Sequence, residues 1–253
     1  MRHPSLGERW RTLPDRNPFF TGREAVLTQL REALTKQGRA VLCGLGGVGK
    51  TQTAAEYAHR HLDQYVYTFW VNAASGEAIL SGYVTIAGLL KLPEATAQDQ
   101  TVAVDAVKRW LSSSQGWLLI LDNADRPDIV KPFLPRGPAG HVLLTSREQT
   151  FDTIEIVKPI ELNDMSNTDA RTFLLKRAGR ESAGDPESNA ASELAAEVGF
   201  LPLALEQAGA CIVRNNSLFQ DYLKSFRNRS LELLNKHGPV VGVIANPYAL
   251  LGQ

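Results

Sequence analysis

The sequence has few cysteines, no long apolar run and no excess of charge of either sign. Two cysteines, Cys43 and Cys211, occur among 253 residues, which is too few for a disulfide framework and favours a reducing compartment. The 27 Lys and Arg residues balance 27 Asp and Glu residues, so no net charge attracts nucleic acid or a membrane surface. The longest apolar runs, such as 117–121, are far shorter than the roughly 20 residues that span a bilayer. No apolar stretch typical of a signal peptide follows Arg2 and His3. We therefore expect a cytoplasmic globular protein with neither a membrane nor a nucleic acid as partner.

The most informative segment is GLGGVGKT at residues 44–51, which fits the phosphate-binding pattern G-x-x-x-x-G-K-[ST]. An apolar stretch at 39–43 precedes it, and apolar residues at helical spacing follow at 51–62, so the loop joins a strand to a helix. Glycines let backbone N–H groups point inward at an anion, and the helix adds its positive end. We expect Lys50 to reach the β- and γ-phosphates of a nucleotide and the Thr51 hydroxyl to ligate Mg²⁺.

Apolar or β-branched stretches alternate with helical patterns over the first two thirds of the chain. Strands are expected at 39–43, 65–71, 117–122, 141–147 and 154–157. Helices are expected at 23–35, 51–62, 77–92 and 102–111, with Thr21 and Glu24 forming a capping box for the first. This alternation predicts an α/β fold, a P-loop NTPase with a five-stranded parallel sheet covered by helices.

The pattern becomes purely helical after Pro159. Helices are expected at 169–178 (capped by Ser166), 190–198, 203–214, 217–227 and 230–236, with a loop at 179–188. These helices predict a small all-α bundle. The expected domains are a flexible lead-in at 1–16, a P-loop nucleotide-binding domain at 17–159, a helical subdomain at 160–237 and an unassigned tail at 238–253.

Two polar residues follow buried strands and are expected at the carboxyl edge of the sheet, where open α/β sheets bind ligands. Asp122 ends the strand 117–122, and an acid at this place beside a P-loop is expected to hold Mg²⁺. Arg147 ends the strand 141–147, where a guanidinium can fork onto a γ-phosphate. The alternative for Arg147 is a solvated loop arginine.

Five motifs, taken in order, resemble those of the NB-ARC ATPases, a branch of the STAND signalling NTPases. They are FTGRE at 20–24, GGVGKT at 46–51, LLILD at 118–122, LLTSR at 143–147 and GFLPLA at 199–204. The resemblance implies a module that binds ADP or ATP with Mg²⁺. Relatives continue into a winged-helix domain and repeats, which nothing after residue 215 matches, so we expect a module truncated after its first helical, GLPL-containing subdomain.

The resemblance also implies roles for single residues. Phe20, Gly22 and Arg23 would line the adenine side of the site, although Phe20 and its neighbour Phe19 also suit a core. Pro202 would press on the nucleotide, besides starting a helix, where proline is favoured. The implied nucleotide-binding set is Phe20, Gly22, Arg23, Gly44, Gly46, Gly47, Val48, Gly49, Lys50, Thr51, Gln52, Arg147 and Pro202. The implied catalytic set is Lys50, Asp122, Asn123 and Arg147, and the implied Mg²⁺ ligands are Thr51 and Asp122.

One position departs from the family pattern. The family usually has a second acid after the metal-binding aspartate, whereas this chain has Asn123. An amide cannot accept a proton from an attacking water, although it can orient that water. Asp125 is a candidate substitute base.

Three functions fit these motifs. The first is a signalling switch, ADP-bound at rest and ATP-bound when active, with slow Mg²⁺-dependent hydrolysis. The second is an ordinary turnover ATPase, which Asn123 disfavours. The third is a binding-only regulatory module that associates with itself or with full-length relatives. A DNA-binding role is disfavoured by the balanced charge.

Overall fold

The computed structural model describes residues 10–137, 139–151, 154 and 158–237, with side chains of the last helix described as far as residue 229. The chain divides into two compact units. The first comprises Met1–Asn17, Arg23–Leu45 and Lys50–Leu162, and the second comprises Pro18–Gly22, Gly46–Gly49 and Asn163–Gln253.

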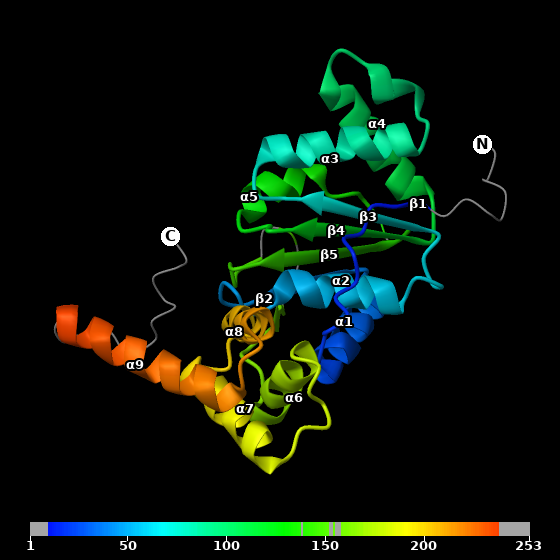
Figure 1. Ribbon diagram of the computed structural model, residues 1–253. Helices are drawn as coiled ribbons and strands as arrows, with labels where there is room; N and C mark the ends of the chain where they lie inside the picture. The colour runs from blue at the N-terminus through cyan, green and yellow to red at the C-terminus, as the bar shows by residue number, and fades with distance from the viewer. Residues whose placement is uncertain (1–9, 138, 152–153, 155–157, 238–253) are drawn as a thin grey trace. The chain divides into compact units, whose positions relative to one another are not determined.

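The first unit is built on a six-stranded parallel sheet (Figure 1). Its strands are β1 (Trp10–Arg11), β2 (Arg39–Cys43), β3 (Tyr67–Asn72), β4 (Trp117–Asp122), β5 (His141–Ser146) and β6 (Ile160–Glu161). Their spatial order is β1-β3-β4-β5-β2-β6. Without the two-residue β1, the remaining five strands form the predicted five-stranded parallel sheet. The predicted α/β fold class is therefore confirmed.

Helices cover both faces of this sheet, with α3 and α4 on one face and α1 and α2 on the other (Figure 1). The helices are α1 (Glu24–Gln37), α2 (Lys50–Arg60), α3 (Gly76–Leu89), α4 (Gln100–Ser113) and the short α5 (Pro127–Val130), with 3₁₀ turns η1 (Pro93–Thr96) and η2 (Lys131–Phe133). Strand β4 is buried at every position, which explains its continuous apolar sequence. The sheet is therefore covered on both faces, and its carboxyl edge carries Asp122.

A segment before the first helix adds an edge strand that sequence analysis did not predict. Strand β1 pairs with β3, and Thr12 extends the pairing because its hydroxyl accepts the Trp70 N–H at 2.7 Å. Arg16 then forms two hydrogen bonds with the buried Glu56 of α2, at 2.9 and 2.7 Å. A strand of two residues is too short to produce a recognisable pattern, which is why this edge was missed.

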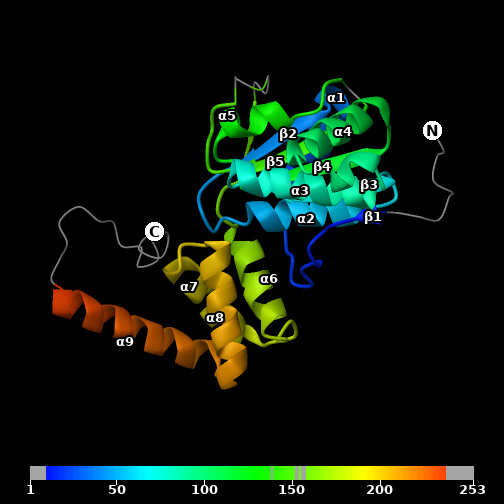
Figure 2. The same ribbon diagram turned by 90° about the horizontal axis from the view of Figure 1, so that it is seen from above.

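The second unit contains four helices in the described part of the chain: α6 (Asn167–Arg177), α7 (Asp185–Glu197), α8 (Pro202–Asn215) and α9 (Phe219–His237). Helices α6, α7 and α8 pack side by side, and α9 packs against α7 (Figure 2). Ser166 caps α6 as predicted, because its side chain accepts the Asp169 N–H at 3.0 Å. The predicted helical bundle is therefore confirmed.

Several predicted boundaries were wrong. The two helices expected at 217–227 and 230–236 are the single helix α9, because no glycine or proline interrupts the chain between them. Helix α7 begins at Asp185, inside the expected loop, with a proline in its first turn. Sequence analysis did not predict strand β6 at Ile160–Glu161, which pairs with β2. It predicted a strand at 154–157 instead. Of that predicted strand, residues 155–157 lie outside the described residues.

The predicted capping box of α1 is also wrong. Its N-cap is Arg23, which has a left-handed backbone with φ 70° and makes no side-chain cap. The Thr21 hydroxyl instead donates to the Phe19 carbonyl oxygen at 2.8 Å. Two successive left-handed residues, Gly22 and Arg23, turn the chain into the helix, so the threonine side chain does not reach the helix N-terminus. Within the ranges that the structure describes, no helix is long and apolar enough to cross a bilayer.

Candidate functional site

Lys50 is the first residue of α2, directly after the glycine-rich loop. Its ammonium donates to the carbonyl oxygens of Gly44 and Leu45, both at 2.8 Å. Burial lowers the pKa of this ammonium, and Arg147 lowers it further, while Asp125 and Asp122 act in the opposite direction. The ammonium is therefore held over the start of the loop, close to charges from two other strand ends.

The tip of the loop, Gly46–Gly49, belongs to the second unit. Gly47 and Gly49 have left-handed backbones, with φ 78° and 97°, which side chains rarely tolerate. The Leu203 N–H donates to the Gly47 carbonyl oxygen at 3.2 Å, and a Cβ on Gly49 would lie 3.9 Å from the Pro202 ring. Within this unit, the first turn of α8 therefore contacts the loop tip, and Pro202 also occupies the helix-starting position.

Asp122 lies at the carboxyl end of β4 and is 6% exposed. Its Oδ1 accepts a hydrogen bond from the Thr51 hydroxyl at 2.9 Å and another from the Thr145 hydroxyl at 2.5 Å. The predicted pair of Mg²⁺ ligands, Thr51 and Asp122, is thus brought together. No cluster of three metal-ligating His, Cys, Asp or Glu residues occurs among the described residues. Mg²⁺ keeps several waters and binds through one or two protein oxygens plus substrate phosphates, so this hydroxyl and carboxylate suit it.

Arg147 follows β5 and forms an ion pair with Asp125 that sequence analysis did not predict. The Arg147 Nε donates to Asp125 Oδ2 at 2.7 Å, and the Arg147 backbone N–H donates to Oδ1 at 2.7 Å. The Ser146 hydroxyl also donates to Oδ1, at 3.1 Å. Burial acts to raise the pKa of Asp125, but these hydrogen bonds and the guanidinium charge outweigh it and lower that pKa. Asp125 is therefore a carboxylate already engaged by three donors, which makes it a weak general base.

Asn123 is exposed and has a left-handed backbone with φ 63°, a conformation that asparagine tolerates. Its N–H donates to the Thr145 hydroxyl at 3.0 Å. The turn after β4 is therefore fixed by the neighbouring strand β5. The hydroxyl of Thr145 was not singled out by sequence analysis, although the TSR motif contains it.

Phe20 and Gly22, which were expected on the adenine side, and the neighbouring Phe19 each have different contacts. Phe19 packs against the core of the second unit, with the Arg177 guanidinium 5.0 Å from its ring centre, so the core interpretation holds for Phe19. In the same unit, a Cβ on Gly22 would lie 2.7 Å from the Asp169 carboxyl group. Phe20 is half-buried.

The predicted site residues divide between the two units. The first unit contains Arg23, Gly44, Lys50, Thr51, Gln52, Asp122, Asn123 and Arg147. The second unit contains Phe20, Gly22, Gly46, Gly47, Val48, Gly49 and Pro202. Gln52 is exposed on α2, whereas Val48 is buried. The first unit brings together Lys50, Thr51, Asp122 and Arg147 at the carboxyl edge of its sheet, which is the edge that the topology predicts.

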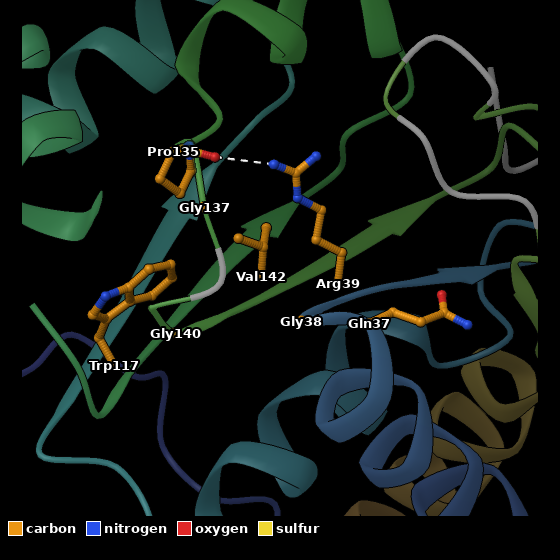
Figure 3. A pocket seen from close by; sticks show the side chains of 8 residues that line it. All are labelled: Gln37, Gly38, Arg39, Trp117, Pro135, Gly137, Gly140 and Val142. Carbon is orange, nitrogen blue, oxygen red and sulfur yellow. Dashed lines mark hydrogen bonds between the residues drawn. The ribbon is translucent and has the colours of Figure 1, made fainter. Parts of the chain in front are cut away.

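A separate pocket of about 250 Å³ lies at the opposite, amino edge of the sheet (Figure 3). It is lined by Gln37, Gly38, Arg39, Trp117, Pro135, Gly137, Gly140 and Val142. The Arg39 guanidinium donates to the carbonyl oxygens of Pro135 and Ile154, at 3.0 and 3.3 Å. These bonds tie two loops to the start of β2, so this arginine already has a structural role away from the phosphate-binding loop.

Residues 31–136 match the family model of the AAA domain. The chain contains an AAA-type P-loop NTPase domain. The matched range includes the glycine-rich loop and Asp122, which are the two parts of the site joined by the hydrogen bond from Thr51.

This AAA-type domain is related to regulatory proteins that are much longer than the chain. A nucleotide-binding leucine-rich repeat (NLR)-like protein of Hyaloscypha variabilis is 28% identical over 242 residues, covering 85% of this chain and 24% of the relative. The regulatory protein AfsR of Streptomyces griseus is 32% identical over 211 residues, covering 78% of this chain and 21% of the relative. The chain therefore spans a quarter or less of the length of these relatives.

Three solved structures illustrate the likeness of fold. A Walker-type ATPase of Pyrococcus abyssi has a TM-score of 0.60 at 16% identity, covering 90% of this chain and 79% of that one. Cdc6p of Pyrobaculum aerophilum has a TM-score of 0.58 at 18% identity, covering 84% and 66%. A signal transduction ATPase with numerous domains (STAND) from Pyrococcus horikoshii, with a tetratricopeptide repeat sensor, has a TM-score of 0.54 at 21% identity, covering 79% and 31%. These likenesses show the fold, a P-loop sheet followed by helices.

Proposed function

We propose that the chain is an NB-ARC module of the STAND type, which binds ADP or ATP and acts as a nucleotide-dependent signalling switch with slow Mg²⁺-dependent hydrolysis. The observation that carries this proposal is the hydrogen bond from Thr51 to Asp122 beside Lys50, at the carboxyl edge of the sheet. Two relatives are named regulatory proteins and a third is NLR-like, which supports a signalling role. Five motifs in NB-ARC order support the finer assignment.

Phosphate binding would rest on the loop and Lys50. The carbonyl oxygens that accept hydrogen bonds from the Lys50 ammonium are neutral. A phosphate oxygen is charged, and a hydrogen bond to it is about twice as strong. The ammonium would therefore exchange a carbonyl for a phosphate oxygen when a nucleotide binds. The adenine side would be formed by Phe20, Gly22 and Arg23, an assignment that rests on the family resemblance alone.

Thr51 and Asp122 would hold Mg²⁺, directly or through water. The ion would supply positive charge that neutralises the phosphates. The Thr51 hydroxyl has one proton and gives it to Asp122, so its lone pairs are left for a cation. The Thr51 hydroxyl and the Asp122 carboxylate would thus both offer oxygen lone pairs to the metal ion.

Hydrolysis would be slow because no uncommitted carboxylate lies next to Asp122 in the part of the chain that the structure describes. Asn123 is an amide, and Asp125 Oδ1 accepts hydrogen bonds from the Ser146 hydroxyl and the Arg147 backbone N–H, neither of which depends on the Arg147 guanidinium. General-base assistance worth about 10²–10⁴-fold is then missing. An ordinary turnover ATPase is therefore disfavoured. A binding-only module is the second candidate, because a site with the amide of Asn123 in place of a second acid can bind a nucleotide without hydrolysing it.

Arg147 would act as the sensor of the γ-phosphate by changing partners. Its side chain is 67% exposed, and an exposed ion pair is worth only about 0–1 kcal/mol. A charge-assisted hydrogen bond to phosphate is worth about 1.5–3 kcal/mol. ATP can therefore draw Arg147 from Asp125, whereas ADP lacks the phosphate that would do so. The two nucleotides would thus leave Arg147 in different positions, which is what a switch requires.

Calorimetry of the purified chain with ADP and with a non-hydrolysable ATP analogue tests the proposal. The parent should bind both, and Lys50→Ala should weaken both by roughly ten- to a hundred-fold because a charge-assisted contact is lost. Lys91→Ala, which removes a lysine on the loop after α3, is the matched control and should bind as the parent does. A parent that binds neither nucleotide, or a Lys50→Ala variant that binds both unchanged, would refute the assignment.

The proposed compartment is the cytoplasm, since both cysteines are free.

A further inference from the structure

We infer that Thr145 is a positioning residue for the Mg²⁺-binding carboxylate: its buried hydroxyl fixes the orientation of Asp122 from the neighbouring strand. The inference rests on the proposed function, because it concerns the same metal site. It assigns a role to the first polar residue of the TSR motif, whose arginine alone was expected to act in the site.

The geometry determines the direction of every hydrogen bond around this hydroxyl. Thr145 lies on β5 with no exposed surface, and its Oγ1 lies 2.5 Å from Asp122 Oδ1 and 3.0 Å from the Asn123 backbone nitrogen. The Asn123 N–H can only donate, so Oγ1 accepts there. A hydroxyl has one proton, and that proton is left for the carboxylate. The Thr145 hydroxyl therefore accepts a hydrogen bond from the turn after β4 and donates one to the metal-binding acid.

Two hydroxyls from two different elements meet at the same carboxylate oxygen. Thr51 donates to Asp122 Oδ1 from α2, and Thr145 donates to it from β5. A carboxylate held by one donor can rotate about its χ2 bond, which is a broad torsion. A second donor from another direction removes that freedom. The lone pairs of Thr51 and Asp122 would then stay aimed at one point, where Mg²⁺ would bind.

The same stretch of β5 also holds the other half of the site. The Thr145 carbonyl oxygen accepts the Ala124 N–H at 2.8 Å, so backbone and side chain together fix the turn at Asn123. The next two residues, Ser146 and Arg147, both donate to Asp125 in that turn. Thr145 therefore connects the metal-binding acid to the segment that carries the proposed sensor.

The sheet offers a matched control on the next strand but one. Thr68 lies on β3, is as fully buried as Thr145, and its hydroxyl has no hydrogen-bond partner among the residues that the structure describes. Thr145→Val and Thr68→Val make the same chemical change in the same sheet. They differ in whether the lost hydroxyl was bonded to Asp122.

The experiment measures the affinity for ADP by calorimetry, in Mg²⁺ and in EDTA, for the parent and both valine variants. In Thr145→Val the gain in affinity on adding Mg²⁺ should fall by about ten-fold, while affinity in EDTA stays within about two-fold of the parent, because a hydrogen bond to a charged group is lost only at the metal-binding acid. Thr68→Val should keep the full Mg²⁺ effect. An unchanged Mg²⁺ effect in Thr145→Val would overturn the inference, as would an equal loss in Thr68→Val.

A second pair of variants keeps the test decisive if valine is not tolerated at residue 145. Thr145→Ser and Thr145→Ala both lack the methyl group and differ only in the hydroxyl. Retention of the Mg²⁺ effect in serine and its loss in alanine support the inference, whereas equal behaviour of the two overturns it. Failure of the proposed function is distinguishable, since in that case the parent itself would show no nucleotide binding or no Mg²⁺ effect.

Discussion

Arg147 contacts Asp125 at two points, because its Nε donates to one carboxylate oxygen and its backbone N–H donates to the other, both at 2.7 Å. The residues are 22 positions apart in sequence, at the ends of β4 and β5. A carboxylate bound in this way keeps the guanidinium at the carboxyl edge of the sheet. It also competes with any phosphate for that guanidinium, so the pair determines how strongly ATP must bind to displace it.

Substitution of Arg147 should weaken binding of ATP but not of ADP. Arg147→Ala is expected to weaken binding of a non-hydrolysable ATP analogue by about ten-fold and to change ADP affinity by less than two-fold, because ADP has no γ-phosphate. Calorimetry with both nucleotides checks this. Equal weakening of both would show that Arg147 contributes only general positive charge.

Asp125→Asn is the complementary control, since it removes the competing carboxylate and keeps the side-chain shape. The ATP analogue should then bind as tightly as to the parent or up to about five-fold more tightly, the range given by an exposed ion pair. A large loss of ATP-analogue binding would mean that Asp125 orients Arg147 toward the phosphate rather than away from it.

The fold was predictable because it depends on local patterns. Strand β4 is apolar at five successive positions and ends in an acid, and the glycine-rich loop lies between a strand and a helix. Strands β1 and β6 have two residues each, and so short a segment carries no period that would predict its place. Helix α9 is continuous where two helices were predicted, because the sequence between residues 219 and 237 contains neither glycine nor proline, the usual signals for the end of a helix.

The site was predictable only in its residue types. The P-loop pattern placed Lys50 and Thr51, and the strand pattern placed Asp122 and Arg147. The hydrogen bonds from Thr145 to Asp122 and from Arg147 to Asp125 join residues 23 and 22 positions apart. Such pairings depend on strand order and register, which a single sequence does not contain.

The two buried threonines of the sheet should respond oppositely when unfolding is measured. Thr68→Val should raise the free energy of unfolding by about 1 kcal/mol, because a buried hydroxyl without a partner is replaced by a methyl group of the same shape. Thr145→Val should lower it by about 1.5–3 kcal/mol, since Asp122 loses a donor. Urea unfolding followed by tryptophan fluorescence reports on the first unit, which contains all four tryptophans. A destabilised Thr68→Val would indicate that its hydroxyl has a partner such as a buried water.

His141 should make the first unit sensitive to acid. Its Nδ1 lies 2.7 Å from the Tyr65 hydroxyl, and burial lowers the pKa of the imidazole below its ordinary value of 6.5. The folded state therefore prefers the neutral ring. Stability from this group is fully present above about pH 6.5, the ordinary value, and is lost as the pH falls below it, since the unfolded chain binds the proton more readily.

The measurement compares the urea midpoint at pH 7.5 and pH 5.5 for the parent and for His141→Asn, again by tryptophan fluorescence. The variant should be less stable at pH 7.5 but should lose less stability on acidification than the parent does. The same substitution at His59, which contacts the Pro14 carbonyl oxygen, is the control for removing a histidine. An equal acid loss in parent and His141→Asn would show that other groups cause it.

The rate of hydrolysis provides the last prediction. The loop, Lys50 and the metal-binding residues can position and neutralise the phosphates, but they do not take the proton from water. Turnover in a small GTPase without its activating partner, on the order of 10⁻⁴ per second, shows how slow such a site can be. We therefore expect turnover well below about one per minute, against roughly ten per second for a typical enzyme.

Asn123→Asp tests whether a missing base is the reason for slow turnover. Asn123 is exposed, and aspartate tolerates its left-handed backbone, so the substitution changes the charge with little change of shape. It should raise the single-turnover rate by about 10²-fold or more, in line with the 10²–10⁴-fold range of general-base assistance, and leave ATP affinity within a few-fold. Asp125→Asn should leave the rate nearly unchanged, because the Ser146 hydroxyl and the Arg147 backbone N–H still donate to Asp125 when the Arg147 guanidinium leaves it. A parent that turns over several times per second would contradict the slow switch. A rate that falls in Asp125→Asn and does not rise in Asn123→Asp would identify Asp125 as the base, released from Arg147 when ATP binds.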